Sequence, residues 1–168
     1  PNVPGIVRYQ YVLPARPPVG DNEKARKVFD KAYHHHKLNQ LNEAIAGYRE
    51  ALVLDPAFQQ AHLNSAIAYQ AKGEFNKALS SYELALAINP LSKISRYGFA
   101  QSLHRGEFYV DAAREFEKLI KVHEAYLPGH LELAIIYAGK LQLPNRAKMH
   151  YRRVLELDPQ HSEAPVIR

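Results

Sequence analysis

The chain has 168 residues, of which 46% are apolar, and a formal net charge of +5 at pH 7. It contains no cysteine, which excludes a disulfide framework and a thiolate metal site. No apolar run approaches the roughly 18–20 residues that span a bilayer, and no signal-peptide pattern opens the chain. These features favour a cytoplasmic protein of about one domain, although a start at Pro1 leaves open whether a leader was removed.

Residues 1–22 differ from the rest because their prolines and glycines rule out a long helix. The stretch 6–13 within them has a strong preference for extended backbone. We expect an extended arm that either lies against the first helices or joins a partner. Alternation along the stretch would suit strand addition to another chain. The alternating residues are Val7, Tyr9, Tyr11 and Leu13, and the last three are the predicted arm contacts.

From residue 23 onward, apolar residues recur with helical spacing, interrupted by polar breaks. Helices are predicted at residues 23–37, 41–54, 57–71, 75–88, 91–105, 108–121, 125–139 and 144–157. Gly73 and Gly106 mark two of the breaks, and Gly73 is well placed as a left-handed helix terminator. Three residues that precede prolines are expected to cap the turn that follows, namely Asp55, Asn89 and Asp158.

These helices repeat in pairs with a period of 34 residues, which indicates a repeat architecture. The same types of residue recur at equivalent positions of four copies. The first copy carries Ala32, His35, Ala44, Tyr48, Ala51 and Pro56, and the second carries Ala66, Tyr69, Ala78, Tyr82, Ala85 and Pro90. The third carries Ala100, Leu103, Ala112, Phe116 and Leu119, and the fourth carries Ala134, Tyr137, Ala147, Tyr151, Val154 and Pro159. Small residues let the two helices approach closely, and the aromatic ring fills the gap. One pair cannot bury its apolar face alone, but stacked neighbours can.

The repeated residues resemble the tetratricopeptide repeat (TPR), in four copies at about 25–58, 59–92, 93–126 and 127–161. The resemblance implies an all-α, right-handed superhelical solenoid of four antiparallel helix pairs, with the start of a capping helix at 162–168. Three features depart from the family pattern. Its large aromatic residue early in the first helix is replaced by Val28, His62, Arg96 and His130. Glu124 stands where proline is usual, and one extra residue falls near 141–143.

The resemblance also implies a non-catalytic adaptor that binds a protein segment in a concave groove lined by the first helices. The groove positions are Arg26, Phe29, Tyr33, His36, Lys37, Leu63, Asn64, Ile67, Gln70, Tyr97, Gln101, His104, Arg105, Leu131 and Ile135. Large apolar side chains there favour a partner surface, and the alternative is that the arm covers them. Chaperone adaptors of the family clamp a C-terminal carboxylate with lysine, asparagine and arginine. The equivalent positions are Phe29, Tyr33, Asn64, Ile94 and Gly98; only Asn64 fits, so that ligand is rejected.

A basic edge is predicted near the C-terminal end, at Arg146, Lys148, Arg152 and Arg153. Such a group can attract an acidic protein, lipid headgroups or nucleic acid, or it can be a solvated helix face. With the arm, it motivates an alternative function: a structural subunit that decorates a filament or assembly and links it to a membrane surface. The repeats resemble the bacterial kinesin-light-chain-like group that accompanies bacterial tubulin. Nucleic acid is not an expected partner, because basic and stacking residues on the first helices are few.

Catalytic and metal motifs are absent from the sequence. There is no glycine-rich phosphate loop, no G-x-S-x-G elbow and no cysteine nucleophile. The three histidines at 34–36 point in different directions around a helix and cannot converge on one ion. His62 and His130 are expected in the core, and Glu115 and Glu117 on exposed helix surface. We therefore expect no enzyme activity, no cofactor and no small-molecule substrate.

Overall fold

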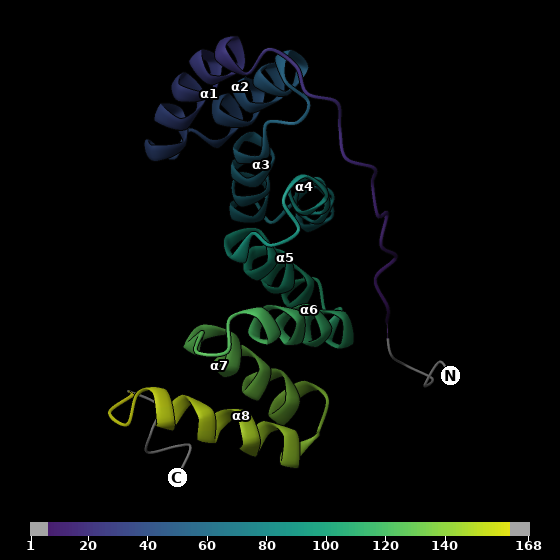
Figure 1. Ribbon diagram of the computed structural model, residues 1–168, viewed down its shortest axis with the longest axis vertical. Coiled ribbons are helices and arrows are strands. Elements are labelled where there is room, and N and C mark those ends of the chain that lie inside the picture. Colours follow the sequence, from purple (N-terminus) through teal and green to yellow (C-terminus); the bar gives the residue numbers. More distant parts are fainter. Residues whose placement is uncertain (1–6, 162–168) are drawn as a thin grey trace. The chain divides into compact units, whose positions relative to one another are not determined.

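The computed structural model describes residues 7–161, in which an extended segment is followed by α-helices joined by short turns (Figure 1). The helices are α1 Asn22–Lys37, α2 Leu41–Leu54, α3 Gln59–Ala71, α4 Phe75–Ile88, α5 Lys93–Arg105, α6 Tyr109–Val122, α7 Leu127–Ile135 and α8 Pro144–Leu157, with a π-helical turn, η1, at Ile136–Lys140. The predicted helix start at 162–168 and the first six residues of the predicted arm lie outside the described residues.

The helices belong to two compact units. The N-terminal unit comprises residues 10–102, and the C-terminal unit comprises residues 103–161 together with residues 7–9 of the described chain. Within the units, α1 packs on α2, α3 on α4, and α7 on α8, which are the pairs that the repeat predicts. The all-α helix-pair architecture expected from the sequence is confirmed.

The core of each pair combines small residues with an aromatic ring at the predicted spacing. In α2, Ala44, Tyr48 and Ala51 have no exposed surface. The corresponding residues of the next two second helices are buried as well, namely Ala78, Tyr82, Ala85, Ala112, Phe116 and Leu119. Because interiors are close-packed, an added methyl group on one of these alanines would push the helices of a pair apart.

A turn delays the start of the first helices by about two residues relative to the prediction. The amide of Phe58 donates to the carbonyl of Asp55 at 3.1 Å, and the amide of Ser92 donates to the carbonyl of Asn89 at 3.1 Å. The predicted caps hold the same turns: side chains of Asp55, Asn89 and Asp158 accept from the amide two residues later at 3.1–3.2 Å. The capping predictions are therefore confirmed.

The breaks inside the first three pairs share one backbone hydrogen bond. The amides of Gln40, Glu74 and Phe108 donate to the carbonyls of His35, Tyr69 and Leu103, each at 2.9 Å. The residue before each of these amides has positive φ: Asn39 at 58°, Gly73 at 75° and Glu107 at 66°. The prediction for Gly73 is confirmed. At the third break, Glu107, one residue after Gly106, adopts the left-handed conformation.

The fourth pair absorbs its extra residue in the helix as well as in the loop. The amide of Leu143 donates to the carbonyl of Tyr137 at 2.7 Å, which is one residue wider than the equivalent bond in the other pairs. The amide of Leu141 donates to the carbonyl of Ile136 at 3.0 Å, an i→i+5 bond that widens the last turn of the helix into η1. The insertion that the sequence places near 141–143 therefore begins at Ile136.

Hydrogen-bond donors occupy three positions where the family's usual aromatic residue is missing. His62 donates to the carbonyl of Pro56 at 2.9 Å, and Arg96 donates to the carbonyl of Pro90 at 2.7 Å. At the third position, His130 Nε2 lies 2.9 Å from the carbonyl of Glu124. Each donor thus satisfies a carbonyl of the turn six residues earlier. His62 and His130 are each only 7% exposed, so their predicted core placement is confirmed.

The Gly98→Ala variant should be less stable than the wild type, because its new Cβ would lie 2.5 Å from Cζ and 2.6 Å from Cε1 of Tyr82. The ring of Tyr82 is buried and cannot move freely, so we expect a loss of about 1–3 kcal/mol in the free energy of unfolding. The measurement is urea unfolding followed by circular dichroism. Gly139→Ala is the matched control, since nothing lies within 4 Å of its Cβ. Equal losses in both variants would contradict the explanation.

Candidate protein-binding surfaces

The exposed sides of α1, α3 and α5 in the N-terminal unit form a surface that we term the first-helix face. Along α1, the rings of Phe29 and Tyr33 stack with centroids 6.0 Å apart, and Lys37 Nζ lies 5.3 Å from the centroid of Tyr33. Phe29 also packs against the buried rings of Tyr48 and Phe58, at 5.3 and 5.1 Å. Tyr33 is thus held from below while 43% of its surface remains exposed.

Buried tyrosines of the second helices hold polar residues of this face. His36 Nδ1 lies 2.9 Å from the hydroxyl of Tyr48. One repeat later, the hydroxyl of Tyr82 donates to Gln70 Oε1 at 3.0 Å, and Ser102 donates to the same oxygen at 3.0 Å. Burial lowers the pKa of His36 below its usual value, which favours a neutral ring. The sequence predicted His36 and Gln70 as groove positions but did not predict these tethers.

The other predicted groove residues of the N-terminal unit are half-buried or exposed. Ile67 is 37% exposed, and Tyr97 accepts a hydrogen bond from Gln101 at 3.0 Å. Asn64 donates to the carbonyl of Gln60 at 2.8 Å. The remaining members are half-buried Leu63 and exposed Arg26. Since none is fully buried, these positions are open to contact by another molecule.

Four predicted groove residues belong to the C-terminal unit. His104 Nδ1 lies 3.5 Å from a carboxylate oxygen of Glu132, and Ile135 is 37% exposed. Leu131 is half-buried, whereas Arg105 is exposed. The two aliphatic groove residues of α7, Leu131 and Ile135, are therefore also at least partly exposed.

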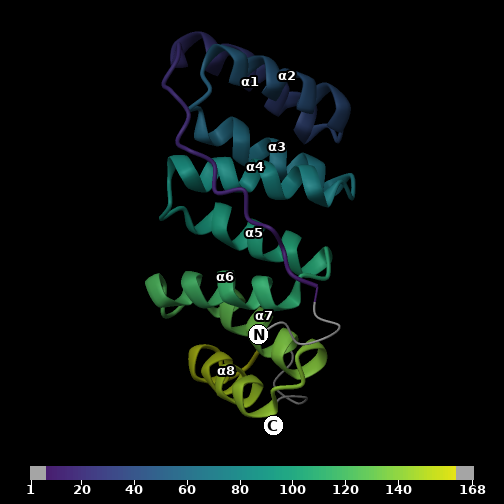
Figure 2. The same cartoon turned by 90° about the vertical axis from the view of Figure 1, so that its right-hand side faces the viewer.

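The arm, defined as residues 7–20, contains no helix and is bonded to second helices. In the N-terminal unit it passes across α4, where the amides of Val12 and Leu13 donate to Glu83 at 2.9 and 3.0 Å (Figure 2). The amide of Gly20 donates to Asp55 at 2.9 Å. The ring of Tyr11 meets that of Phe99 edge-on at 5.9 Å. These contacts are made to residues outside the predicted groove.

The predicted one-sided alternation of the arm is wrong. Tyr9 and Tyr11 are half-buried, whereas the side chains of Val7 and Leu13 are 63% and 78% exposed. Leu13 has a φ of 49°, which turns the backbone out of a regular strand. Side-chain carboxylates, rather than the edge of a sheet, accept the arm's amides.

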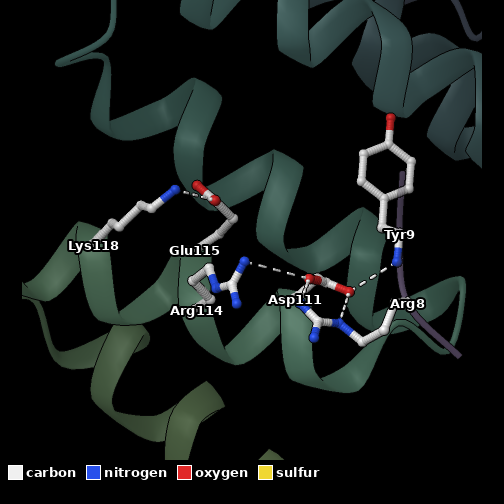
Figure 3. Close-up of polar contacts among 6 residues, drawn as sticks. All are labelled: Arg8, Tyr9, Asp111, Arg114, Glu115 and Lys118. Atoms are coloured by element: carbon white, nitrogen blue, oxygen red, sulfur yellow. Dashed lines mark hydrogen bonds and ion pairs between the residues drawn. The ribbon is translucent and has the colours of Figure 1, made fainter. Parts of the chain in front are cut away.

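A cluster of buried acidic groups on α6 was not predicted. Asp111 has no exposed surface and Glu115 is 1% exposed, so the expectation that Glu115 lies on exposed surface is wrong. Figure 3 shows Asp111 facing Arg8 and the amide of Tyr9, while Lys118 binds Glu115 at 2.7 Å. Burial alone would raise the pKa of Asp111, but the hydrogen bonds from Arg8 and Tyr9 outweigh it and lower the pKa. Helical periodicity could not predict the burial of Asp111, because Arg8 and Tyr9 of the arm cover it.

The four residues of the predicted basic edge do not act as one group. Arg146 lies 3.7 Å from Glu117 and donates to the hydroxyl of Tyr137 at 3.3 Å. Arg153 pairs with Glu156 at 3.0 Å. Lys148, Arg152 and Arg153 line an open depression of about 560 Å³ beside exposed Met149, and Arg146 does not line it. The positive charge of the basic edge is therefore partly neutralised by ion pairs within the chain, which a count of charges along the sequence could not show.

Two buried histidines meet beneath this depression. His130 Nδ1 and His150 Nδ1 lie 3.1 Å apart, so one ring must donate and the other accept. Tyr137 stacks on His150 at 5.8 Å. Burial, reinforced by His130, lowers the pKa of His150 to about 4. A neutral His150 ring is therefore part of how α8 packs on α7.

Metal and membrane features are absent from the described part of the chain. Within residues 7–161, His, Asp and Glu side chains nowhere gather in groups of three or more that could hold a metal ion. No helix in the same range has the length and hydrophobicity to cross a membrane.

The paired helices and their repeated core define a helical-repeat protein. Family models described as "TPR repeat" and "Tetratricopeptide repeat" match residues 32–73, 61–94 and 128–161. The chain therefore belongs to the tetratricopeptide repeat family. It is 29% identical over 99 residues to mouse Superkiller complex protein 3, and this match spans 59% of the chain but only 6% of the length of that protein.

Solved structures of TPR proteins share the fold. A crystal structure of MamA superposes with a TM-score of 0.78 at 18% identity, over 85% of this chain and 83% of MamA. A TPR protein from Parabacteroides merdae gives 0.81 at 17% identity, over 86% of this chain and 57% of that one. The first TPR of Spaghetti (RPAP3), bound to the HSP90 peptide SRMEEVD, gives a TM-score of 0.66 at 23% identity, over 70% of this chain and 96% of that one. At these identities the likeness concerns the fold.

The stability of the protein should fall as the pH drops from about 6.5 toward 4. His150 is protonated near pH 6.5 when unfolded but only near pH 4 when folded, so the unfolded state binds more protons in this window. We expect its contribution to the free energy of unfolding to fall by about 2–3 kcal/mol. The measurement is urea unfolding at a series of pH values. His150→Phe keeps a ring in place and should flatten this part of the profile; an unchanged slope would contradict the assignment.

Proposed function

We propose that this protein is a non-catalytic scaffold that binds a segment of a partner protein through the first-helix face. The observation that carries the proposal is the stack of Phe29, Tyr33 and Lys37 on α1, in which an exposed ring is held rigidly. Rigid aromatic side chains bind partners at a small cost in conformational entropy. The RPAP3 structure, in which a protein of the same fold is bound to a peptide, supports binding of a protein segment.

The chemistry of the face favours an apolar segment with polar groups at its edges. Tyr33 and Ile67 offer exposed apolar surface, and tethered Gln70 and His36 offer fixed polar atoms beside it. A terminal carboxylate is not the proposed ligand, because four of the five positions of a carboxylate clamp hold an aromatic residue, an aliphatic residue or glycine, and none holds a cation. Ile94 is 62% exposed there, and Gly98 is buried against Tyr82.

Replacing two tyrosines of the face should weaken partner binding. We expect Tyr33→Ala with Tyr97→Ala to lower the affinity for a partner captured by the wild-type chain by about tenfold or more, because buried aromatic anchors dominate such interfaces. The measurement is isothermal titration calorimetry with the purified partner. Val53→Ala with Leu91→Ala is the matched control, since these residues are 82% and 72% exposed and lie outside the predicted groove. An affinity unchanged by the tyrosine substitutions would overturn the proposal.

The alternative proposal is a structural subunit on a filament or assembly that also contacts a membrane surface. Exposed Lys148 and Arg152 beside Met149 on α8 support it, because cationic and apolar side chains together suit an anionic surface. Lys148→Ala with Arg152→Ala should then reduce co-sedimentation with anionic vesicles or filaments at low salt, measured by pelleting. Arg146→Ala with Arg153→Ala controls for general charge, since both are internally paired. Equal pelleting by all variants would remove the α8 surface from consideration.

A further inference from the structure

A second helix in each unit binds extended backbone of the arm: α4 in the N-terminal unit and α6 in the C-terminal unit. The arm is bonded through main-chain amides and one arginine, and its acceptors are carboxylates that are almost fully buried: Glu83 is 5% exposed and Asp111 is not exposed. Burial of a carboxylate is costly unless it is paired and hydrogen-bonded. These groups are therefore adapted to the segment that covers them.

The contact at α6 binds an arginine followed by an aromatic residue. Arg8 donates from Nε and Nη2 to the two oxygens of Asp111, at 2.9 and 2.7 Å, in a bidentate pair (Figure 3). The amide of Tyr9 donates to Asp111 at 2.8 Å, and its ring meets that of Phe108 edge-on at 5.4 Å. Bidentate pairing fixes geometry as well as charge. Glu83 adds a second point of recognition, for the amides of Val12 and Leu13.

The 34-residue repeat does not itself require these carboxylates. The position of Glu83 holds Arg49 in the first copy, and the position of Asp111 holds Lys77 in the second. Opposite charges at the same repeat positions show that helix packing accepts either. The acidic groups that contact the arm are therefore a feature of the surface of α4 and α6, beyond what the fold needs.

The arm adds little to the apolar core. Val7, Val12 and Leu13 are between 63% and 78% exposed, and the arm has no secondary structure of its own. Its release would break hydrogen bonds and ring contacts while the helices stay packed. The same bonds would form with an arm of identical sequence from another molecule.

We propose that the contact on α4 and the contact on α6 each accept the arm of a second copy of the chain, so that copies associate by exchanging arms. This goes beyond the proposed function, because it concerns the second helices and not the first-helix face. Exchange replaces contacts within one chain by the same contacts between two chains. The fraction of exchanged molecules therefore depends on the protein concentration. A segment tethered nearby has an effective concentration on the order of 1 mM, which keeps the wild-type arm bound to its own chain at lower concentrations. When a chain's own arm can no longer bind its own acceptors, binding of an arm from a second chain can be detected.

The test mixes two full-length variants, each defective in one half of the contact. Glu83→Gln with Asp111→Asn weakens the site but leaves the arm intact. Arg8→Ala with Val12→Pro weakens the arm but leaves the site intact, since proline has no amide N–H. We expect each variant alone to sediment as a monomer. A 1:1 mixture should form a heterodimer at about 50 μM, because neither variant has an intact arm and intact acceptors in the same chain. This concentration is well below the effective concentration of the tethered arm. Sedimentation velocity measures this, and circular dichroism confirms that both variants fold.

Matched controls decide the outcome. Arg16→Ala alters an exposed arm arginine and keeps Arg8, so its mixture with the site variant should stay monomeric. If the doubly substituted site variant does not fold, Asp111→Asn mixed with Arg8→Ala repeats the test on the single ion pair. A mixture that sediments as the sum of its separate components overturns the proposal. So does dimerisation of the arm variant alone, because it would place the contact elsewhere.

Discussion

The close approach of the two helices in each pair determines the position of the other groups. Alanines such as Ala44 and Ala78 let the backbones approach, and a ring from the same helix face fills the remaining space. The hydroxyls of Tyr48 and Tyr82 therefore end beneath the first-helix face instead of in solvent, within reach of His36 and Gln70. Core packing and the chemistry of the candidate binding surface thus depend on the same tyrosines.

Backbone geometry repeats as faithfully as the side chains do. The turn before each first helix places a carbonyl where the next histidine or arginine can donate to it, as His62 does to Pro56. Glu124 replaces proline without loss of this turn, because the amide of Tyr126 still donates to the carbonyl of His123 at 3.0 Å. The fourth pair differs since one more residue must fit between its helices, and η1 widens a helical turn to accommodate it.

The arm and the buried carboxylates illustrate a different principle. A solvated acidic side chain on a helix needs no partner, whereas a buried one needs donors, and Asp111 and Glu83 obtain them from a segment about 70 to 100 residues away. The contacts on α4 and on α6 each depend on charge and on main-chain hydrogen bonding. The first-helix face, by contrast, offers rings and aliphatic groups. The two surfaces would therefore bind different kinds of segment.

The sequence by itself determined the helix pairs, their boundaries within about two residues, the core positions and the terminator Gly73, because these depend on local spacing that a 34-residue period repeats. The groove positions stay a prediction, and the structure leaves them at least partly exposed. Tertiary structure alone decided that Glu115 is buried, that Arg146 pairs with Glu117, that His130 meets His150, and that the alternation of the arm is broken at Leu13. Each of these depends on which distant segment covers a helix, and periodicity along one helix carries no information about what packs across it.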